Sequence, residues 1–409
     1  MTSQAVSEAP GPAVAVYDSQ QPSGLVREFF GSLDALRGVA ALLVVLYHLP
    51  GWLDPVFEIQ LIRHGYLMVN FFFVLSGFVL FHSYAGRIGN GLSFLKFVAL
   101  RVSRLYPVHL LFVLPFAALE VAKYVAFRRY GMMGSSGVAP SIANIVTTFV
   151  ANLFLVQGLG VTENPTPFNF PNWSISTEFY TYLVFAIGML CFSRRGFRVF
   201  AIAIVALSVG ALVGFGAKLG DLGNMPRCLS GFFFGCLTRA AFEGWRGRTL
   251  QRDWPSWIAA LALLLLSLRW HSPVQGATWL EQLAMPISAL LIVTLLLTPT
   301  SRLNRLLNTR PLRWLGEISY SLYMSHAIVQ WVARQLCKPF ETAVVVDGTA
   351  RDRLPLALGI AAYVLVTLVT LLVARISYLL VEAPLRDKAR RGINAWMKRL
   401  TERETVSPV

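Results

Sequence analysis

The class of the fold is decided by two runs of sequence, RVFAIAIVALSVGALVGFG at residues 198 to 216 and LPLALGIAAYVLVTLVTLL at residues 354 to 372. Each run approaches the roughly 20 apolar residues that a helix needs to cross a hydrocarbon core about 30 Å thick. Similar runs recur along a chain of 409 residues, of which 55% are hydrophobic and only 14% are charged. Soluble domains carry about a quarter charged residues. The sequence therefore predicts an all-α, polytopic integral membrane protein.

Hydropathy predicts about ten transmembrane helices, near residues 33 to 50, 66 to 85, 105 to 123, 173 to 192, 198 to 216, 226 to 242, 255 to 270, 280 to 298, 314 to 336 and 354 to 381. Residues 141 to 160 are also long enough to cross, but they contain Asn144, Asn152 and Gln157, which are costly against lipid. We interpret this segment as a re-entrant or surface-lying piece covered by protein.

The basic residues predict the orientation, because Lys and Arg near span ends are biased to the cytoplasm. With ten spans and both termini cytoplasmic, most basic clusters fall in inner loops, and the exception is the cluster at 123 to 129 after the third span. We predict three regions: a flexible cytoplasmic tail at 1 to 30, a transmembrane domain at 31 to 386 and a basic cytoplasmic tail at 387 to 409.

The formal net charge of +15 does not indicate a nucleic-acid partner, because the basic residues lie in short clusters between apolar runs rather than along one face. They are better explained as topology signals for a lipid bilayer. The cysteines form no CxxC pair and no His spacing suited to a metal, so buried thiols and no metal site are expected at Cys191, Cys228, Cys236 and Cys337.

Ionisable residues inside spans are costly and usually point into a protein-lined cavity. Arg37 and His48 of the first span are eleven positions apart, which on a helix is about three turns and roughly 16 Å, with both side chains on nearly the same face. One cavity could therefore present both. Alternatively, Arg37 reaches the inner headgroups and His48 lies at the outer interface.

The second and third spans add further polar residues. NFFFVLSGFVLFHSY places Ser76 and Gly77 in mid-span, where a small residue lets a helix or ligand come close, although packing alone would explain it. RVSRLYPVHL places Arg101 and Arg104 on one face, and two fixed guanidiniums suit a phosphate or pyrophosphate. An ordinary cluster of cytoplasmic charges is the alternative.

In the block NWSISTEF, Glu178 is predicted to enter the fourth span from the outer side, together with Trp173 and Ser174. A buried carboxylate needs a partner. His48 is predicted at the same depth, and a nearby carboxylate would raise the basicity of its imidazole and fix its tautomer.

Two more motifs lie near the C-terminus. GEISYSLYMSH places polar side chains in the ninth span, at Ser319, Tyr320, Tyr323 and His326. A lone buried His is more often a packing group, but three intramembrane polar sites favour a shared cavity. VEAPLR places Glu382 at the cytoplasmic end of the tenth span, where an ion pair with an inner-loop Arg is expected.

Taken in this order, the motifs resemble acyltransferase family 3 of membrane O-acyltransferases, from about Leu33 to Arg386. The resemblance rests on the Arg37 and His48 pair, FFFVLSGFVL around Ser76, the RxxR of Arg101 and Arg104, NWSISTEF, GEISYSLYMSH and the closing ExP at Glu382.

The resemblance implies transfer of an acyl group, usually acetyl, from cytoplasmic acyl-CoA to a hydroxyl of a sugar-containing acceptor. Such an acceptor would be a surface polysaccharide, a lipid-linked glycan or a macrolide. No bound cofactor is implied, and a multi-pass protein of the bacterial inner membrane is expected.

The resemblance also implies roles. His48 would be the general base or a transient acyl carrier, and Glu178 would orient it. Arg37 would lie on the CoA side or stabilise the oxyanion. Acyl-CoA would be bound by Arg101, Arg104 and Ser76, and the site would be supported by Trp173, Ser174, Ser319, Tyr320, Tyr323, His326 and Glu382.

A transporter or flippase for a lipid-linked or anionic small molecule is the alternative function. It would use the same polar cavity without covalent chemistry. Against it, the sequence shows no inverted repeat of the kind expected for transporters.

Overall fold

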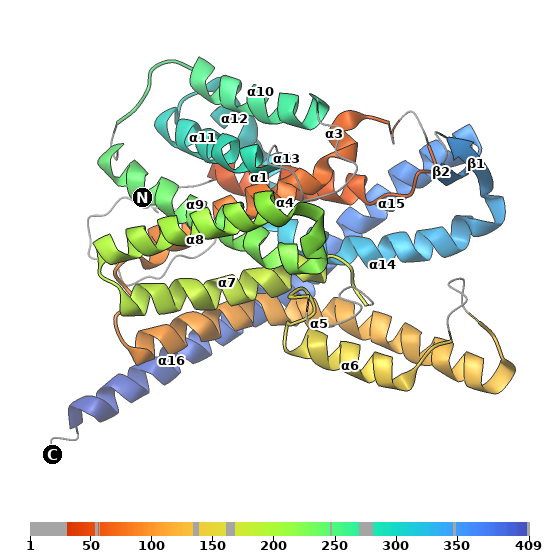
Figure 1. Ribbon diagram of the computed structural model, residues 1–409, viewed down its shortest axis with the longest axis horizontal. Helices are drawn as coiled ribbons and strands as arrows, with labels where there is room; N and C mark the ends of the chain where they lie inside the picture. Colours follow the sequence, from red (N-terminus) through yellow and green to blue (C-terminus); the bar gives the residue numbers. More distant parts are fainter. Residues whose placement is uncertain are drawn as a thin grey trace, which may run out of the picture. The chain divides into compact units, whose positions relative to one another are not determined.

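The computed structural model describes residues 31–53, 56, 58–133, 139–160, 168–245, 248–269, 281–346 and 349–406. The regular secondary structure of the described part is helical apart from one antiparallel hairpin of β1 (Thr342–Val346) and β2 (Thr349–Arg353) (Figure 1). The all-α prediction is therefore confirmed. The region predicted as a flexible tail, 1 to 30, lies outside the described residues.

Each predicted span overlaps at least one helix, although the bounds differ. Those in the first half of the chain are α1 (Gly31–Tyr47), α3 (Gln60–Arg63), α4 (Met68–Tyr84), α5 (Gly91–Tyr130), α6 (Ile142–Leu153), α7 (Asn172–Cys191) and α8 (Arg194–Phe215). Those in the second half are α9 (Asn224–Phe242), α10 (Trp254–Arg269), α11 (Ala284–Leu297), α12 (Arg302–Leu307), α13 (Arg310–Glu317), α14 (Ser319–Cys337), α15 (Leu356–Ser377) and α16 (Ala383–Val406).

Five continuous helical segments of the described chain are long and apolar enough to cross a membrane, at Gly65–Tyr84, Gly91–Tyr130, Asn172–Cys191, Arg194–Trp245 and Leu356–Leu400. The segment Arg194–Trp245 contains both α8 and α9, which are joined by a 3-10 segment, Gly216–Gly223, that is non-helical at Gly220. Shorter apolar helices accompany these segments. The ten-span count and the cytoplasmic placement of the termini remain predictions.

Helix α5 is much longer than the span predicted for it. It begins at a capping box, in which the Ser93 amide donates to Asn90 Oδ1 at 2.8 Å, and it ends at Gly131, which has a φ of 66°. Forty residues rise about 60 Å, twice the hydrocarbon thickness. Hydropathy missed the first part because Arg101 and Arg104 lie there.

Helix α6 forms within the segment 141 to 160. Its 12 residues rise about 18 Å, which is too short to cross the hydrocarbon core. Asn152 is buried, and its carbonyl oxygen is 2.9 Å from Nε2 of His109 on α5. Ile142 and Val146 are exposed. Helix α6 therefore lies on the surface of the described fold with one face covered by protein, whereas Leu155 and Gln157, which follow it, are buried.

The region predicted as a basic tail, 387 to 409, is helical as far as the structure describes it. A π-helical segment, Tyr378–Glu382, joins α15 to α16, and α16 lies beside α5 (Figure 1). Hydropathy alone could not predict this, because α16 is a polar helix that continues from an apolar one.

Glycines set the closest helix contact. A Cβ at Gly77 of α4 would lie 1.8 Å from the Phe232 carbonyl oxygen of α9, and one at Gly235 of α9 would lie 2.0 Å from the Val74 carbonyl oxygen. Backbones can approach this closely only where no side chain intervenes, as in the small-xxx-small pattern of membrane helices. Gly231 and Gly235 form that pattern in α9. The interpretation of the Ser76 and Gly77 motif as a packing site is thus supported, and the helix that packs there is α9.

Candidate active site

His48 follows the last residue of α1. Its Nδ1 is 2.9 Å from the Val44 carbonyl oxygen, one turn back along the helix. A carbonyl oxygen only accepts hydrogen bonds, so Nδ1 carries the proton of the neutral ring and the lone pair is on Nε2. The backbone of α1 therefore fixes the tautomer that leaves Nε2 able to accept a proton.

His326 of α14 lies beside His48. The centroids of the two imidazole rings are 5.0 Å apart, and Nδ1 of His326 is 2.7 Å from the Tyr323 carbonyl oxygen. His326 is completely buried, yet its Nε2 has no hydrogen-bond partner among the described residues. The Phe170 ring packs on both imidazoles, with centroid distances of 4.6 Å to His48 and 5.2 Å to His326. The structure thus brings together two of the predicted site residues.

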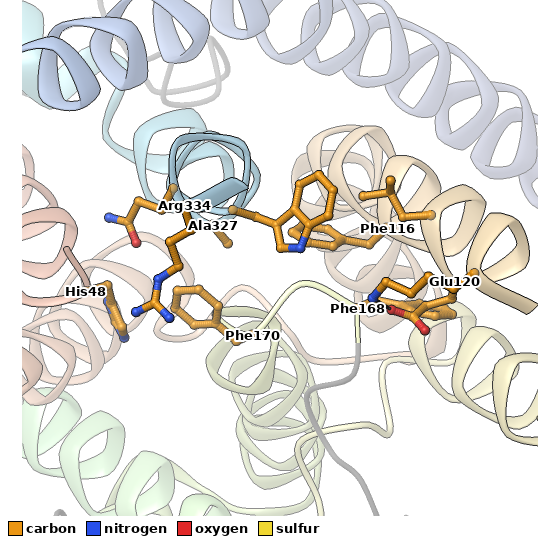
Figure 2. Close-up of a pocket in the computed structure, with 11 residues that line it drawn as sticks. His48, Phe116, Glu120, Phe168, Phe170, Ala327 and Arg334 are labelled. Carbon is orange, nitrogen blue, oxygen red and sulfur yellow. Dashed lines mark hydrogen bonds and ion pairs between the residues drawn. The ribbon is translucent and has the colours of Figure 1, made fainter. Parts of the chain in front are cut away.

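A pocket of about 390 Å³ opens in front of His48 (Figure 2). Helices α5 and α14, the residue after α1 and the segment before α7 line it. Its residues are His48 after α1, Phe116, Leu119, Glu120 and Lys123 from α5, Phe168 and Phe170 from the segment before α7, and Ala327, Gln330, Trp331 and Arg334 from α14. Its volume lies within the range of about 300–1,000 Å³ that ligand pockets occupy.

Glu178 does not pair with His48, which corrects the sequence-based prediction. Its Oε1 accepts a hydrogen bond from the Tyr182 hydroxyl at 2.5 Å, and that hydroxyl is also 3.1 Å from Ser76 Oγ. Ser174, in the first turn of α7, is linked instead to Tyr323 of α14 at 2.8 Å. Glu178 lies four residues, about 6 Å, further along α7. The start of α7, rather than Glu178, is therefore linked to the region of the histidines.

Arg101 joins Glu178, Ser76 and Tyr182 in what we call the inner cluster. Its guanidinium carbon lies 5.6–6.0 Å from the ring centroids of Tyr84, Phe97 and Tyr182. Its Nη2 donates to the Tyr84 hydroxyl at 3.4 Å, whereas its buried Nε has no hydrogen-bond partner in the described part of the chain. Arg104 is exposed next to this cluster. The cluster therefore offers cationic groups at a position distinct from the pocket.

Arg37 holds α1 against the start of α14. It donates to Ser319 Oγ at 2.8 Å and to the Gly316 carbonyl oxygen at 3.1 Å, and it forms an ion pair with Asp34 at 3.0 Å. It is not among the described residues that line the pocket of His48. Of the two alternatives for this pair, a single cavity lined by both side chains gains no support from the pocket of His48.

The remaining predicted residues make structural contacts. The Tyr320 hydroxyl donates to the Leu105 carbonyl oxygen at 2.7 Å, and the Trp173 ring lies 5.6 Å from the guanidinium carbon of Arg227. Glu382 accepts a hydrogen bond from Ser321 at 2.6 Å and lies 3.6 Å from Arg386. Its arginine partner is thus one turn further along its own helical segment, and not in an inner loop as predicted.

Sequence reasoning missed two features of the described helices. Gln330 and Arg334 follow His326 at intervals of four residues, the spacing of one helix face, but only His326 was singled out. Arg227 is buried in α9, where it donates to Asn70 Oδ1 at 2.7 Å and to the Tyr66 carbonyl oxygen at 3.1 Å. A charged residue inside a predicted span was the available signal for Arg227.

Residues 30–378 match acyltransferase family 3, described as an acyltransferase domain. The chain belongs to this acyltransferase family. The match covers both histidines, the pocket and the inner cluster, so the motif-based resemblance is confirmed. With its several apolar helices, this acyltransferase family member is a multi-pass membrane protein.

Two relatives are similar to this acyltransferase family member. A Bacillus subtilis (strain 168) protein named "Putative peptidoglycan O-acetyltransferase YrhL" is 24% identical over 413 residues, which is 93% of this chain and 59% of that protein. A Rhizobium radiobacter protein named "Protein 2 in picA locus" is 30% identical over 198 residues, which is 45% of this chain and 95% of that protein. The chain thus spans about three fifths of the Bacillus protein. No solved structure matches it.

Proposed function

We propose that this membrane O-acyltransferase moves an acyl group, acetyl in the first instance, from acyl-CoA to a hydroxyl of a sugar-containing acceptor. The proposal rests on the environment of His48: its Nδ1 is hydrogen-bonded to the Val44 carbonyl oxygen, and its ring lines a ligand-sized pocket. A hydroxyl in that pocket would meet a base of fixed tautomer. The bacterial inner membrane is the proposed location.

In the proposed reaction, Nε2 of His48 takes the proton of the acceptor hydroxyl as its oxygen attacks the thioester carbonyl. The new bond joins the acceptor oxygen to the acyl carbon, and the bond that breaks joins that carbon to sulfur. The proton held by His48 then passes to the CoA thiolate. The ester and free CoA are the products, and no further reactant is required.

The acceptor is proposed from the pocket and from the relatives. Its aromatic lining suits the apolar faces of a sugar ring, and its few polar groups could orient hydroxyls. The Bacillus relative is named for peptidoglycan, so peptidoglycan fragments are the first acceptors to try.

The experiment measures release of free CoA from acetyl-CoA by the purified protein in nanodiscs, together with transfer of radiolabelled acetyl to the acceptor. Peptidoglycan fragments and a neutral polysaccharide serve as acceptors. Acceptor-stimulated CoA release with label in the glycan is expected. Acetyl-CoA that neither binds nor turns over would refute the proposal and favour a transport function.

Arg101 and Arg104 are proposed to hold the CoA phosphates. Replacing both with Gln should raise the KM for acetyl-CoA at least about 10–100-fold, because even one charge-assisted hydrogen bond contributes about 1.5–3 kcal/mol. Steady-state kinetics at a saturating acceptor concentration would measure this. The same charge is removed by Arg128→Gln with Arg129→Gln at the opposite end of α5, and this control should leave the KM unchanged. An equal KM in both double variants would contradict the assignment.

A further inference from the structure

The charges in the pocket do not cancel. Lys123 and Glu120 line one side and form an ion pair with each other at 2.6 Å. Arg334 lines the other side, and its side chain has no hydrogen bond or ion pair within the described part of the chain. With His48 neutral, the lining thus carries one positive charge that no described side chain neutralises.

Helix geometry directs Arg334 toward His48. Arg334 lies in the last turn of α14, and helical side chains lean toward the N-terminus of their helix, which for α14 is the direction of His326. Figure 2 shows the Arg334 side chain extending toward His48 and Phe170. Gln330, one turn earlier, is held by its own hydrogen bond to the Val45 carbonyl oxygen at 2.9 Å. Of these two polar side chains of α14, Arg334 is therefore the one whose polar group is available to a ligand.

The aromatic residues that line the pocket suit a sugar better than a small inorganic anion. Phe116, Phe168, Phe170 and Trp331 give the pocket an aromatic lining. A small anion bound at Arg334 would gain nothing from these rings, whereas a sugar that carries the anionic group could pack its apolar face on them. A planar guanidinium meanwhile matches a carboxylate or a phosphate group with two parallel hydrogen bonds.

We propose that the acceptor is an acidic glycan, and that Arg334 selects it by binding an anionic substituent near the hydroxyl that reacts at His48. The inference rests on the proposed function, because it assigns the same pocket to the acceptor. Arg334 is a specificity-determining residue in this account and takes no part in the proton transfer. A carboxylate and a phosphate share the required chemistry.

The test uses four probes that differ in one group: methyl glucuronoside, its carboxamide, methyl glucoside 6-phosphate and methyl glucoside. Ligand-observed NMR titration with the protein in nanodiscs measures their binding without any acyl donor. Wild type should bind one or both anionic probes about 10–100-fold more tightly than the neutral ones. Preference for the glucuronoside would identify a carboxylate, and preference for the 6-phosphate would identify a phosphate.

Arg334→Gln should bind all four probes equally, and Arg334→Lys should retain part of the preference because it keeps the charge without the planar fork. Lys338→Gln removes an exposed cation one turn beyond Arg334 that does not line the pocket, and it should behave as wild type. Equal or undetectable binding of anionic and neutral probes by wild type would overturn the proposal, as would an unchanged preference in Arg334→Gln.

The binding assay also separates this inference from the function on which it rests. An anionic preference that Arg334→Gln loses would support the acidic ligand even if no acyl transfer were found, and only the acyltransferase reaction would then fail. Transfer to neutral glycans with no anionic preference would support the reaction and overturn the role of Arg334.

Discussion

The His48→Gln variant is expected to transfer acyl groups about 10²–10⁴-fold more slowly than wild type, with the KM for acetyl-CoA little changed. Gln keeps polar atoms at the end of α1 but cannot take a proton from a hydroxyl, and a positioned base contributes about this factor. The measurement is the initial rate of label transfer to the acceptor, with the folded state of each preparation checked by size-exclusion chromatography.

A matched control is available in His64. Its Nδ1 lies 2.7 Å from the Gln60 carbonyl oxygen, four residues back, as Nδ1 of His48 lies against Val44. His64 does not line the pocket. His64→Gln therefore loses the same local contact without the proposed base, and it should keep nearly full activity. Comparable losses in the two variants would mean that the helix end, and not proton transfer, sets the rate.

The sequence predicted the helices better than it predicted the contacts between them. Span 66 to 85 corresponds to the segment Gly65–Tyr84, because a continuous apolar run marks a membrane helix directly. The register between helices carries no such signal. The start of its predicted span placed Glu178 at the depth of His48. In the structure, Glu178 is hydrogen-bonded to Tyr182 of its own helix, and Ser174 is hydrogen-bonded to Tyr323 of α14.

The pocket was harder to predict than the histidines. His326 attracted attention because an ionisable group in mid-span is costly, but Arg334 lies near a span end, where an Arg is ordinarily a topology signal. Phe170 lies in a polar stretch before α7, so nothing in its sequence context indicated a contact with two imidazoles. Such contacts join segments more than 100 residues apart and depend on how the helices pack.

Replacing Gly77 with Ala is expected to destabilise the protein by about 3 kcal/mol or more, because overpacking a tight contact costs 1–3 kcal/mol and the obstacle here is backbone. The added Cβ would lie 1.8 Å from the Phe232 carbonyl oxygen, and α4 and α9 would have to separate before an ordinary contact of 3.4 Å is reached. The apparent melting temperature in one detergent, followed by intrinsic fluorescence, measures the effect.

The control variants for Gly77→Ala are expected to change stability in the opposite direction. Gly210 and Gly214 lie within α8, and a Cβ at either would meet nothing within 4 Å. Ala in place of Gly inside a helix stabilises it by about 0.5–1 kcal/mol, so Gly210→Ala and Gly214→Ala should melt at the same temperature as wild type or higher. Because Ser76 of the inner cluster adjoins Gly77, Gly77→Ala should also raise the KM for acetyl-CoA in whatever folded fraction remains. A Gly77→Ala protein as stable as the α8 variants would show that α4 and α9 do not pack through their backbones.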